Sequence, residues 1–157
     1  MYTPAKTPAI ASRKLVDLVA ALFILVFVYT ATSKLMQLEH FETVLKTSPL
    51  IGGYTRYLSV MLPAIELATA VLLFFPGTRM RGLVLSLALM ILFTVYISYM
   101  LVFNEHLPCS CGGVIGRLSW KEHLFFNFIL TVVAVTAVFH NKIFIAINRG
   151  SRKPVRE

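Results

Sequence analysis

The stretch LVDLVAALFILVFVYTATSKLM, from Leu15 to Met36, decides the class of this protein. It carries charge only at Asp17 and Lys34, near its two ends. A helix needs about 20 mostly apolar residues to cross a bilayer core of about 30 Å. The stretch meets that length, and it exceeds the roughly 7–15 apolar residues of a cleavable signal peptide. We therefore predict an uncleaved membrane span.

Three further apolar segments follow it, Tyr57 to Phe75, Gly82 to Phe103 and Leu124 to Phe139. The last reaches spanning length if Trp120 to His123 lie at the membrane interface, where Trp is favoured. Hydrophobic residues make up 57% of the 157-residue chain and charged residues only 14%, against about 25% charged in soluble domains. The mean hydropathy is +0.77. These values predict an all-α bundle of four transmembrane helices.

The chain then divides into a membrane domain, residues 15–140, and two flanking segments, residues 1–14 and 141–157. With four spans, both termini lie on the same side as the turn from Pro76 to Arg81. That side would hold ten basic residues against four on the other, and loops rich in Lys and Arg stay inside. We therefore expect both termini in the cytoplasm of a bacterium and the chain in its inner membrane.

The basic tail, residues 141–157, accounts for much of the net charge of +8. Because no soluble domain accompanies this charge, we expect contact with anionic lipid of the bilayer and no nucleic-acid partner. The two remaining connections would face the periplasm. One is a loop from Gln37 to Arg56, and the other, residues 104–119, is called the cysteine segment below.

Cys109 and Cys111, the two cysteines of the chain, lie in the sequence PCSCGG of the cysteine segment. A disulfide needs Cα atoms within about 7 Å, which residues i and i+2 can reach in a bent backbone. The bond would be strained and therefore easily reduced. It would add little stability, because it closes almost no loop. A thiol pair that exchanges with a partner in the oxidising periplasm is therefore the favoured interpretation.

Three alternatives stay open for these cysteines. They could sit in a tight turn without any chemistry, or they could link two copies of the chain. They could also bind a soft metal ion together with His106, although a closed structural site usually has four ligands.

Polar residues within the spans mark a second candidate site. Glu66 lies near the middle of its span, where an ionisable residue is costly and therefore a functional candidate. Its natural partner is Lys34, but the depths of the two residues differ by about 12 Å at 1.5 Å per residue. Lys34 would have to reach inward, or another group would have to bridge. The alternative is a neutral Glu66 bonded to a neighbouring helix, with Lys34 extending outward.

His123 and Asn127 are spaced i, i+4 and so share one face near the outer end of the fourth span. If this face turns inward, it lies beneath the cysteine segment. His123 could then lower a thiol pKa or accept its proton, whereas an outward face would leave it solvated. His40 and His140, near span ends, carry no comparable signal.

Several motifs together resemble the MauE family, within the wider DoxX-like group of four-helix membrane proteins. They are SKL at residues 33–35, LPAIE at residues 62–66, PCSCGG at residues 108–113, and Trp120 followed by Asn127. The family usually has an aromatic residue after the second cysteine, where this chain has Gly112. The resemblance implies an inner-membrane accessory protein that helps to mature the disulfide-rich small subunit of methylamine dehydrogenase, or a general thiol-redox relative.

We therefore expect thiol–disulfide exchange at the outer membrane surface, with a periplasmic thioredoxin-like protein or a maturing client as partner. A steady oxidant also needs an acceptor for two electrons. The sequence shows no identifiable cofactor or quinone site, so a quinone in the bilayer is an inference from location alone. Whether the protein is an enzyme stays open. The alternatives are a non-enzymatic assembly scaffold, which should tolerate Cys→Ser changes, and a carrier of metal or small molecules built around Glu66 and Lys34.

Overall fold

The computed structural model describes residues 7–47, 52–103 and 119–150, and within these ranges it contains helices and no strand. In chain order the elements are α1 (Thr7–Met36), α2 (Leu38–Lys46), the 3-10 helix η1 (Gly52–Tyr54), α3 (Thr55–Phe74), α4 (Arg79–Phe103) and α5 (Trp120–Gly150). Four of them contain stretches long and apolar enough to cross a membrane: Lys14–Met36, Thr55–Phe74, Arg79–Phe103 and Trp120–His140. The predicted all-α, four-span fold is confirmed.

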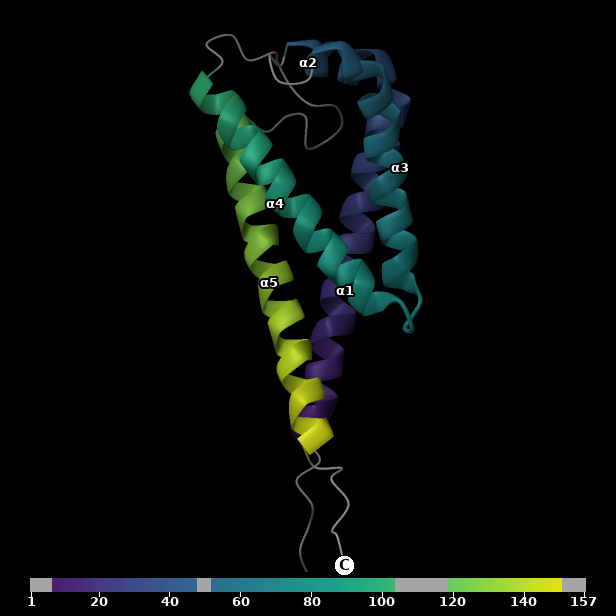
Figure 1. The fold of residues 1–157 in the computed structure, drawn as a ribbon, viewed down its shortest axis with the longest axis vertical. Helices are drawn as coiled ribbons and strands as arrows, with labels where there is room; N and C mark the ends of the chain where they lie inside the picture. The colour runs from purple at the N-terminus through teal and green to yellow at the C-terminus, as the bar shows by residue number, and fades with distance from the viewer. Residues whose placement is uncertain (1–6, 48–51, 104–118, 151–157) are drawn as a thin grey trace, which may run out of the picture.

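The spanning helices form two pairs that lean apart toward one end of the molecule (Figure 1). α1 packs along α3, and α4 packs along α5. The pairs meet through α3 with α4 and through α1 with α5. The end at which α1 begins is narrow, and the end that carries α2 is wide (Figure 1).

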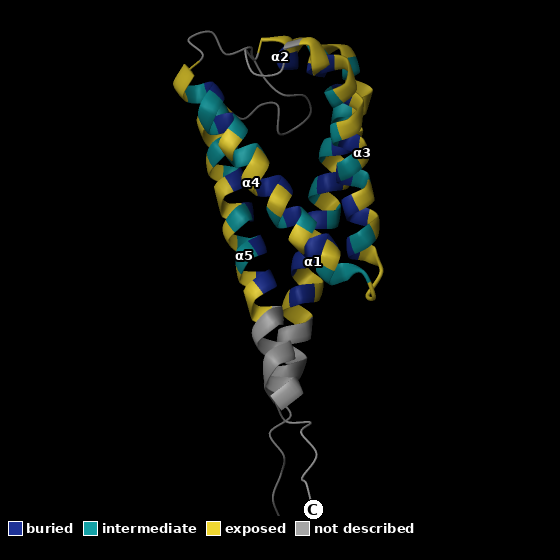
Figure 2. Cartoon of the chain, in the orientation of Figure 1, coloured by how far each residue is buried: buried dark blue, intermediate teal, exposed yellow. Residues whose placement is uncertain are grey.

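The core is built from the inward faces of these helices. Phe23, Phe27, Leu73 and Leu83 are fully buried. Apolar side chains such as Leu25 instead point outward, at 70% exposure. Figure 2 shows this division, with buried residues on the facing sides and exposed residues on the outer ones. An apolar outer surface is what lipid contact requires, because hydrocarbon offers no partner for polar groups.

The connection between α1 and α3 is more ordered than we expected from the sequence. We expected a loop from Gln37 to Arg56, and the structure has α2 and η1 within it. Phe41, Val44 and Leu45 of α2 are buried at helical spacing. On the same helix, Lys46 Nζ lies 2.9 Å from Glu42 Oε1. α2 lies across the wide end of the α1–α3 pair (Figure 1), in the manner of an amphipathic interfacial helix.

Two spanning helices also extend past their apolar stretches. α1 begins at Thr7, and α5 continues to Gly150, so the start of the basic tail is helical. At the same end, Arg79 pairs with Asp17 of α1 and donates from Nε to the Leu73 carbonyl oxygen at 3.2 Å. The ion pair is partly exposed and contributes little to stability. It nevertheless joins the start of α4 to the third turn of α1.

At Gly82, α4 packs closely against α3. A Cβ atom added there would lie 2.9 Å from both the backbone nitrogen and Cγ of Leu73. Because one of these atoms belongs to the backbone, the helices would have to separate, and overpacking of this kind costs about 1–3 kcal/mol. We predict that Gly82→Ala lowers the unfolding temperature in detergent by at least about 3 °C.

Gly77→Ala is the matched control, because a Cβ at Gly77 would meet no atom within 4 Å. Its unfolding temperature should stay at that of the parent chain. Equal melting of the two variants would contradict the close crossing at Gly82.

Candidate functional site

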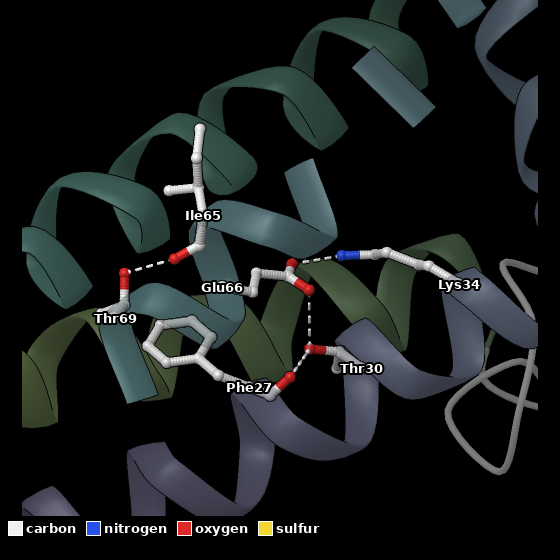
Figure 3. Close-up of polar contacts among 6 residues, drawn as sticks. All are labelled: Phe27, Thr30, Lys34, Ile65, Glu66 and Thr69. Atoms are coloured by element: carbon white, nitrogen blue, oxygen red, sulfur yellow. Dashed lines mark hydrogen bonds and ion pairs between the residues drawn. The ribbon is translucent and has the colours of Figure 1, made fainter. Parts of the chain in front are cut away.

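Glu66 is buried in α3, with its side chain only 1% exposed. Its Oε1 atom forms an ion pair with Lys34 Nζ, and its Oε2 atom lies 3.3 Å from the Thr30 hydroxyl. Thr30 and Lys34 are spaced i, i+4 and so reach from the same face of α1. Figure 3 shows both side chains converging on the Glu66 carboxylate. The two predicted polar residues therefore meet directly, and Lys34 reaches inward without any bridging group.

Lys34 also faces aromatic rings from two other helices. Its Nζ atom lies 5.6 Å from the ring centroid of Phe41 in α2 and 5.0 Å from that of Phe93 in α4. Ring faces attract a cation within about 6 Å. The Lys34 side chain is 21% exposed. Its ammonium group therefore stands between one carboxylate and two aromatic rings contributed by α2, α3 and α4.

These groups line a cavity of about 360 Å³ between the two helix pairs. Most of its wall is apolar or aromatic. The polar and aromatic side chains that line it include Thr30, Ser33, Lys34, Gln37, His40, Phe41, Glu66, Phe93, Tyr96, Trp120, His123, Phe126 and Asn127. Sites for small molecules typically measure about 300–1,000 Å³ and combine apolar walls with a few polar groups. The cavity has both properties.

The start of α5 is fixed by a reciprocal cap. The Ser119 backbone nitrogen donates to Glu122 Oε2 at 2.7 Å, and the Glu122 nitrogen lies 3.4 Å from the Ser119 hydroxyl. This is a capping box, which satisfies the free N–H groups of a first helical turn. It sets the orientation of the turn that carries Trp120 and His123, both of which line the cavity.

The face shared by His123 and Asn127 turns inward. Both residues line the cavity, and Asn127 is only 4% exposed. The Asn127 Nδ2 group donates to the His123 carbonyl oxygen at 3.2 Å. We expected His123 to act on a thiol only if this face turned inward, and it does. The role of His123 in thiol chemistry stays a prediction.

Ser33 adds an unsatisfied polar group to the same wall. Its hydroxyl oxygen is buried and has no hydrogen-bond partner among the residues that the structure describes. Buried polar atoms normally have a partner. The Ser33 hydroxyl is therefore an unsatisfied polar group within the cavity wall.

Cys109, Cys111 and His106 lie outside the described residues, so the thiol pair and the alternative metal site both stay predictions. Across the described ranges, no group of three or more His, Cys, Asp or Glu side chains is placed to hold a metal ion. The chain itself limits where the cysteines can be. Cys109 is six residues after Phe103, the last residue of α4. Because an extended chain spans at most about 3.6 Å per residue, Cys109 lies within six such lengths of the end of α4.

Sequence reasoning missed several residues of the cavity wall. Thr30 could have been found, because it lies four residues before Lys34 on the same helical face. His40 lines the cavity although its position near a span end carried no signal. Phe93 and Phe126 could not have been selected, because the chain has twelve phenylalanines and only tertiary packing decides which of them face the cavity.

Four spans around a mostly apolar cavity that holds the Lys34–Glu66 ion pair define a multi-pass membrane protein. The family model described as "Methylamine utilisation protein MauE" matches residues 12–140, more than half of the chain. The protein therefore belongs to the MauE family, and the match includes the cysteines as well as the whole cavity wall. No curated protein and no solved structure matches it.

The ion pair yields a prediction for stability. Lys34→Met should leave the Glu66 carboxyl buried without its partner, and Glu66→Gln should leave the ammonium group without its counter-charge. Breaking a buried pair costs about 3–5 kcal/mol in soluble proteins, whereas interhelical polar contacts in membranes average about 0.6 kcal/mol. We expect the double variant to lose at least about 1 kcal/mol less than the sum of the single variants, measured by unfolding in detergent.

The pair of an exposed Lys46 and a half-buried Glu42 on α2 provides the matched control. Lys46→Met and Glu42→Gln should change stability by a few tenths of a kcal/mol at most.

Glu66→Lys, which places two ammonium groups together, should give no folded protein. Additive losses at Lys34 and Glu66 would show that the two charges do not depend on each other.

Proposed function

We propose that the protein carries out thiol–disulfide exchange at the periplasmic surface of the bacterial inner membrane. Cys109 and Cys111 would react with a thioredoxin-like protein or with a maturing client. The observation that carries the proposal is the position of the cysteine segment, which joins the end of α4 to the start of α5, where Trp120 and His123 line the cavity. Membership of the MauE family supports an accessory role in maturation.

The chemistry requires an oxidised pair. A client thiolate attacks the Cys109–Cys111 disulfide and forms a mixed disulfide with one of the two cysteines. The second client thiolate then attacks this mixed disulfide and releases the protein from the client. The client gains a disulfide, and the protein keeps two electrons and two protons as a dithiol. His123 is our candidate for the group that moves a thiol proton, because it is half-buried at the start of α5.

The client class follows from the same chemistry. It is a periplasmic protein that needs disulfides in order to fold. The family name indicates methylamine utilisation, and the small subunit of methylamine dehydrogenase is the client that the family resemblance implies. A generalised relative would serve other disulfide-containing proteins by the same reaction.

A carrier is the second candidate function, because Lys34 and Glu66 do form a charged pair on a cavity wall. A carrier should fail when Glu66 is replaced and should tolerate loss of either thiol. A thiol-exchange protein should show the opposite dependence. A scaffold should tolerate both changes.

The orientation is tested first, because the proposal requires the cysteines to face the periplasm. The excess of basic residues on the terminal side predicts cytoplasmic termini. A C-terminal fusion to a fluorescent protein that folds only in the cytoplasm should fluoresce, and a fusion to periplasmic alkaline phosphatase should be inactive. The reverse result would overturn the orientation and the proposed thiol chemistry together.

The thiol pair is tested by covalent trapping. Cys109→Ser and Cys111→Ser should each leave one thiol that captures a partner in a mixed disulfide, whereas the double variant should capture none. In the parent chain the pair should equilibrate with glutathione, at a potential above the roughly −300 mV of structural disulfides. Mass-tag alkylation across a glutathione redox series measures this equilibrium.

The unfolding temperature should barely change in any cysteine variant, because so short a loop hardly constrains the unfolded chain. Thiols that stay reduced under oxidising conditions would exclude the exchange reaction. A bond that resists all but strong reductants would exclude it as well, and either result would favour the scaffold.

A further inference from the structure

We infer that the cavity between the two helix pairs binds the ring of a lipid-soluble quinone. The site consists of described residues alone, with Lys34 and Ser33 of α1 on one wall and His123 and Asn127 of α5 on another. The use of the quinone as an electron acceptor rests on the proposed thiol function. Binding of the ring does not.

The charge of the cavity selects an uncharged ligand. In the described part of the chain, the Lys, Arg, Asp and Glu side chains that line it are Lys34 and Glu66. They neutralise each other by direct contact. A carboxylate or phosphate ligand would compete with Glu66 for the ammonium group at a site with no excess positive charge. An uncharged molecule with hydrogen-bond acceptors avoids this competition.

Hydrogen-bond donors lie on separate walls of the cavity. An ammonium group has three N–H donors, and at Lys34 one of them is directed to Glu66 Oε1. The Ser33 hydroxyl has no partner in the described part of the chain. His123 and Asn127 face the cavity from α5. A quinone ring suits this arrangement, because it carries two carbonyl acceptors on opposite edges.

Aromatic side chains provide surfaces against which a flat ring can pack. Phe41, Phe93, Trp120 and Phe126 come from three different helices and line the cavity. Aromatic rings favour offset-stacked or edge-to-face contact with one another. The volume of about 360 Å³ lies near the lower end of the range for small-molecule sites, which fits a head group whose tail remains outside.

The cavity wall also reaches the lipid-facing surface. Leu92 lines the cavity, lies near the middle of α4 and is 55% exposed. A residue at that depth borders the hydrocarbon of the bilayer. The cavity wall therefore borders the lipid, and this position suits a ligand with an isoprenoid tail in the lipid better than a water-soluble redox compound.

The electron balance closes with this acceptor. The Cys109 and Cys111 thiols lose two protons and two electrons and form the disulfide. The quinone takes up both electrons and two protons, so that its two carbonyl groups become the hydroxyl groups of a quinol. Each turnover thereby restores the disulfide that a client has reduced.

Trp120 makes binding measurable, because it is the chain's single tryptophan and it lines the cavity. We would titrate the detergent-purified protein with a short-chain ubiquinone and follow quenching of Trp120 fluorescence. N-acetyltryptophanamide in the same micelles reports non-specific quenching. Quenching should saturate in the parent chain and equally in the variant with both cysteines replaced by serine.

Two variants probe the polar walls. Lys34→Met should weaken binding at least tenfold. Asn127→Leu should weaken it severalfold while the helix is kept, since the change conserves size, and it keeps the proposal testable if Lys34→Met does not fold. Lys46→Met, on the exposed face of α2, should leave the affinity unchanged.

Linear quenching of Trp120 equal to that of N-acetyltryptophanamide would overturn the quinone site. Displacement of the quinone by equimolar oleate would also overturn it, because this would indicate a site for lipid carboxylates. A second measurement follows quinol formation when the reduced protein meets the quinone without oxygen, and the expected yield is equimolar with the disulfide formed.

The two proposals fail in distinguishable ways. Saturable binding without quinol formation would refute the electron transfer while the site stands. Successful trapping of mixed disulfides without quinone binding would refute the site while the thiol function stands.

Discussion

The ion pair between Lys34 and Glu66 is the constraint on which the rest of the structure depends. An isolated charge in the hydrocarbon region is costly, so each of these groups requires an enclosed partner. Their contact fixes α1 against α3, and Thr30 adds a hydroxyl from the same face of α1. Phe41 and Phe93 then cover the ammonium group, which places α2 and α4 around the pair.

The pair also shows that residue counts along two helices do not fix the distance between side chains on them. A depth difference of about 12 Å follows if α1 and α3 are aligned at one membrane level with a rise of 1.5 Å per residue. α2 and η1 intervene between the two helices, so the first residue of α3 need not lie level with the last residue of α1. A long Lys side chain spans the remainder. Sequence identified the two partners, and only packing could show that they meet.

The spans themselves were predictable, because length and hydropathy are properties of the chain alone. The ends of the helices were less predictable from the sequence. α1 and α5 continue beyond their apolar stretches into polar sequence, where hydropathy gives no signal but the helical backbone persists. α2 was missed because nine residues are too few to span. Even so, the spacing of Phe41, Val44 and Leu45 is that of an amphipathic helix, and this signal was readable.

The cavity follows from how side-chain size is distributed along the bundle. Ala134 and Ala137 of α5 are fully buried, and small residues let helices approach closely. Nearer the start of the same helix, the large side chains of Trp120 and Phe126 face the cavity. Protein interiors seldom keep voids larger than a water molecule. A space of about 360 Å³ is far larger than that and falls within the range of small-molecule sites. The neutral ion pair and the aromatic walls favour an uncharged, planar occupant that arrives through the membrane.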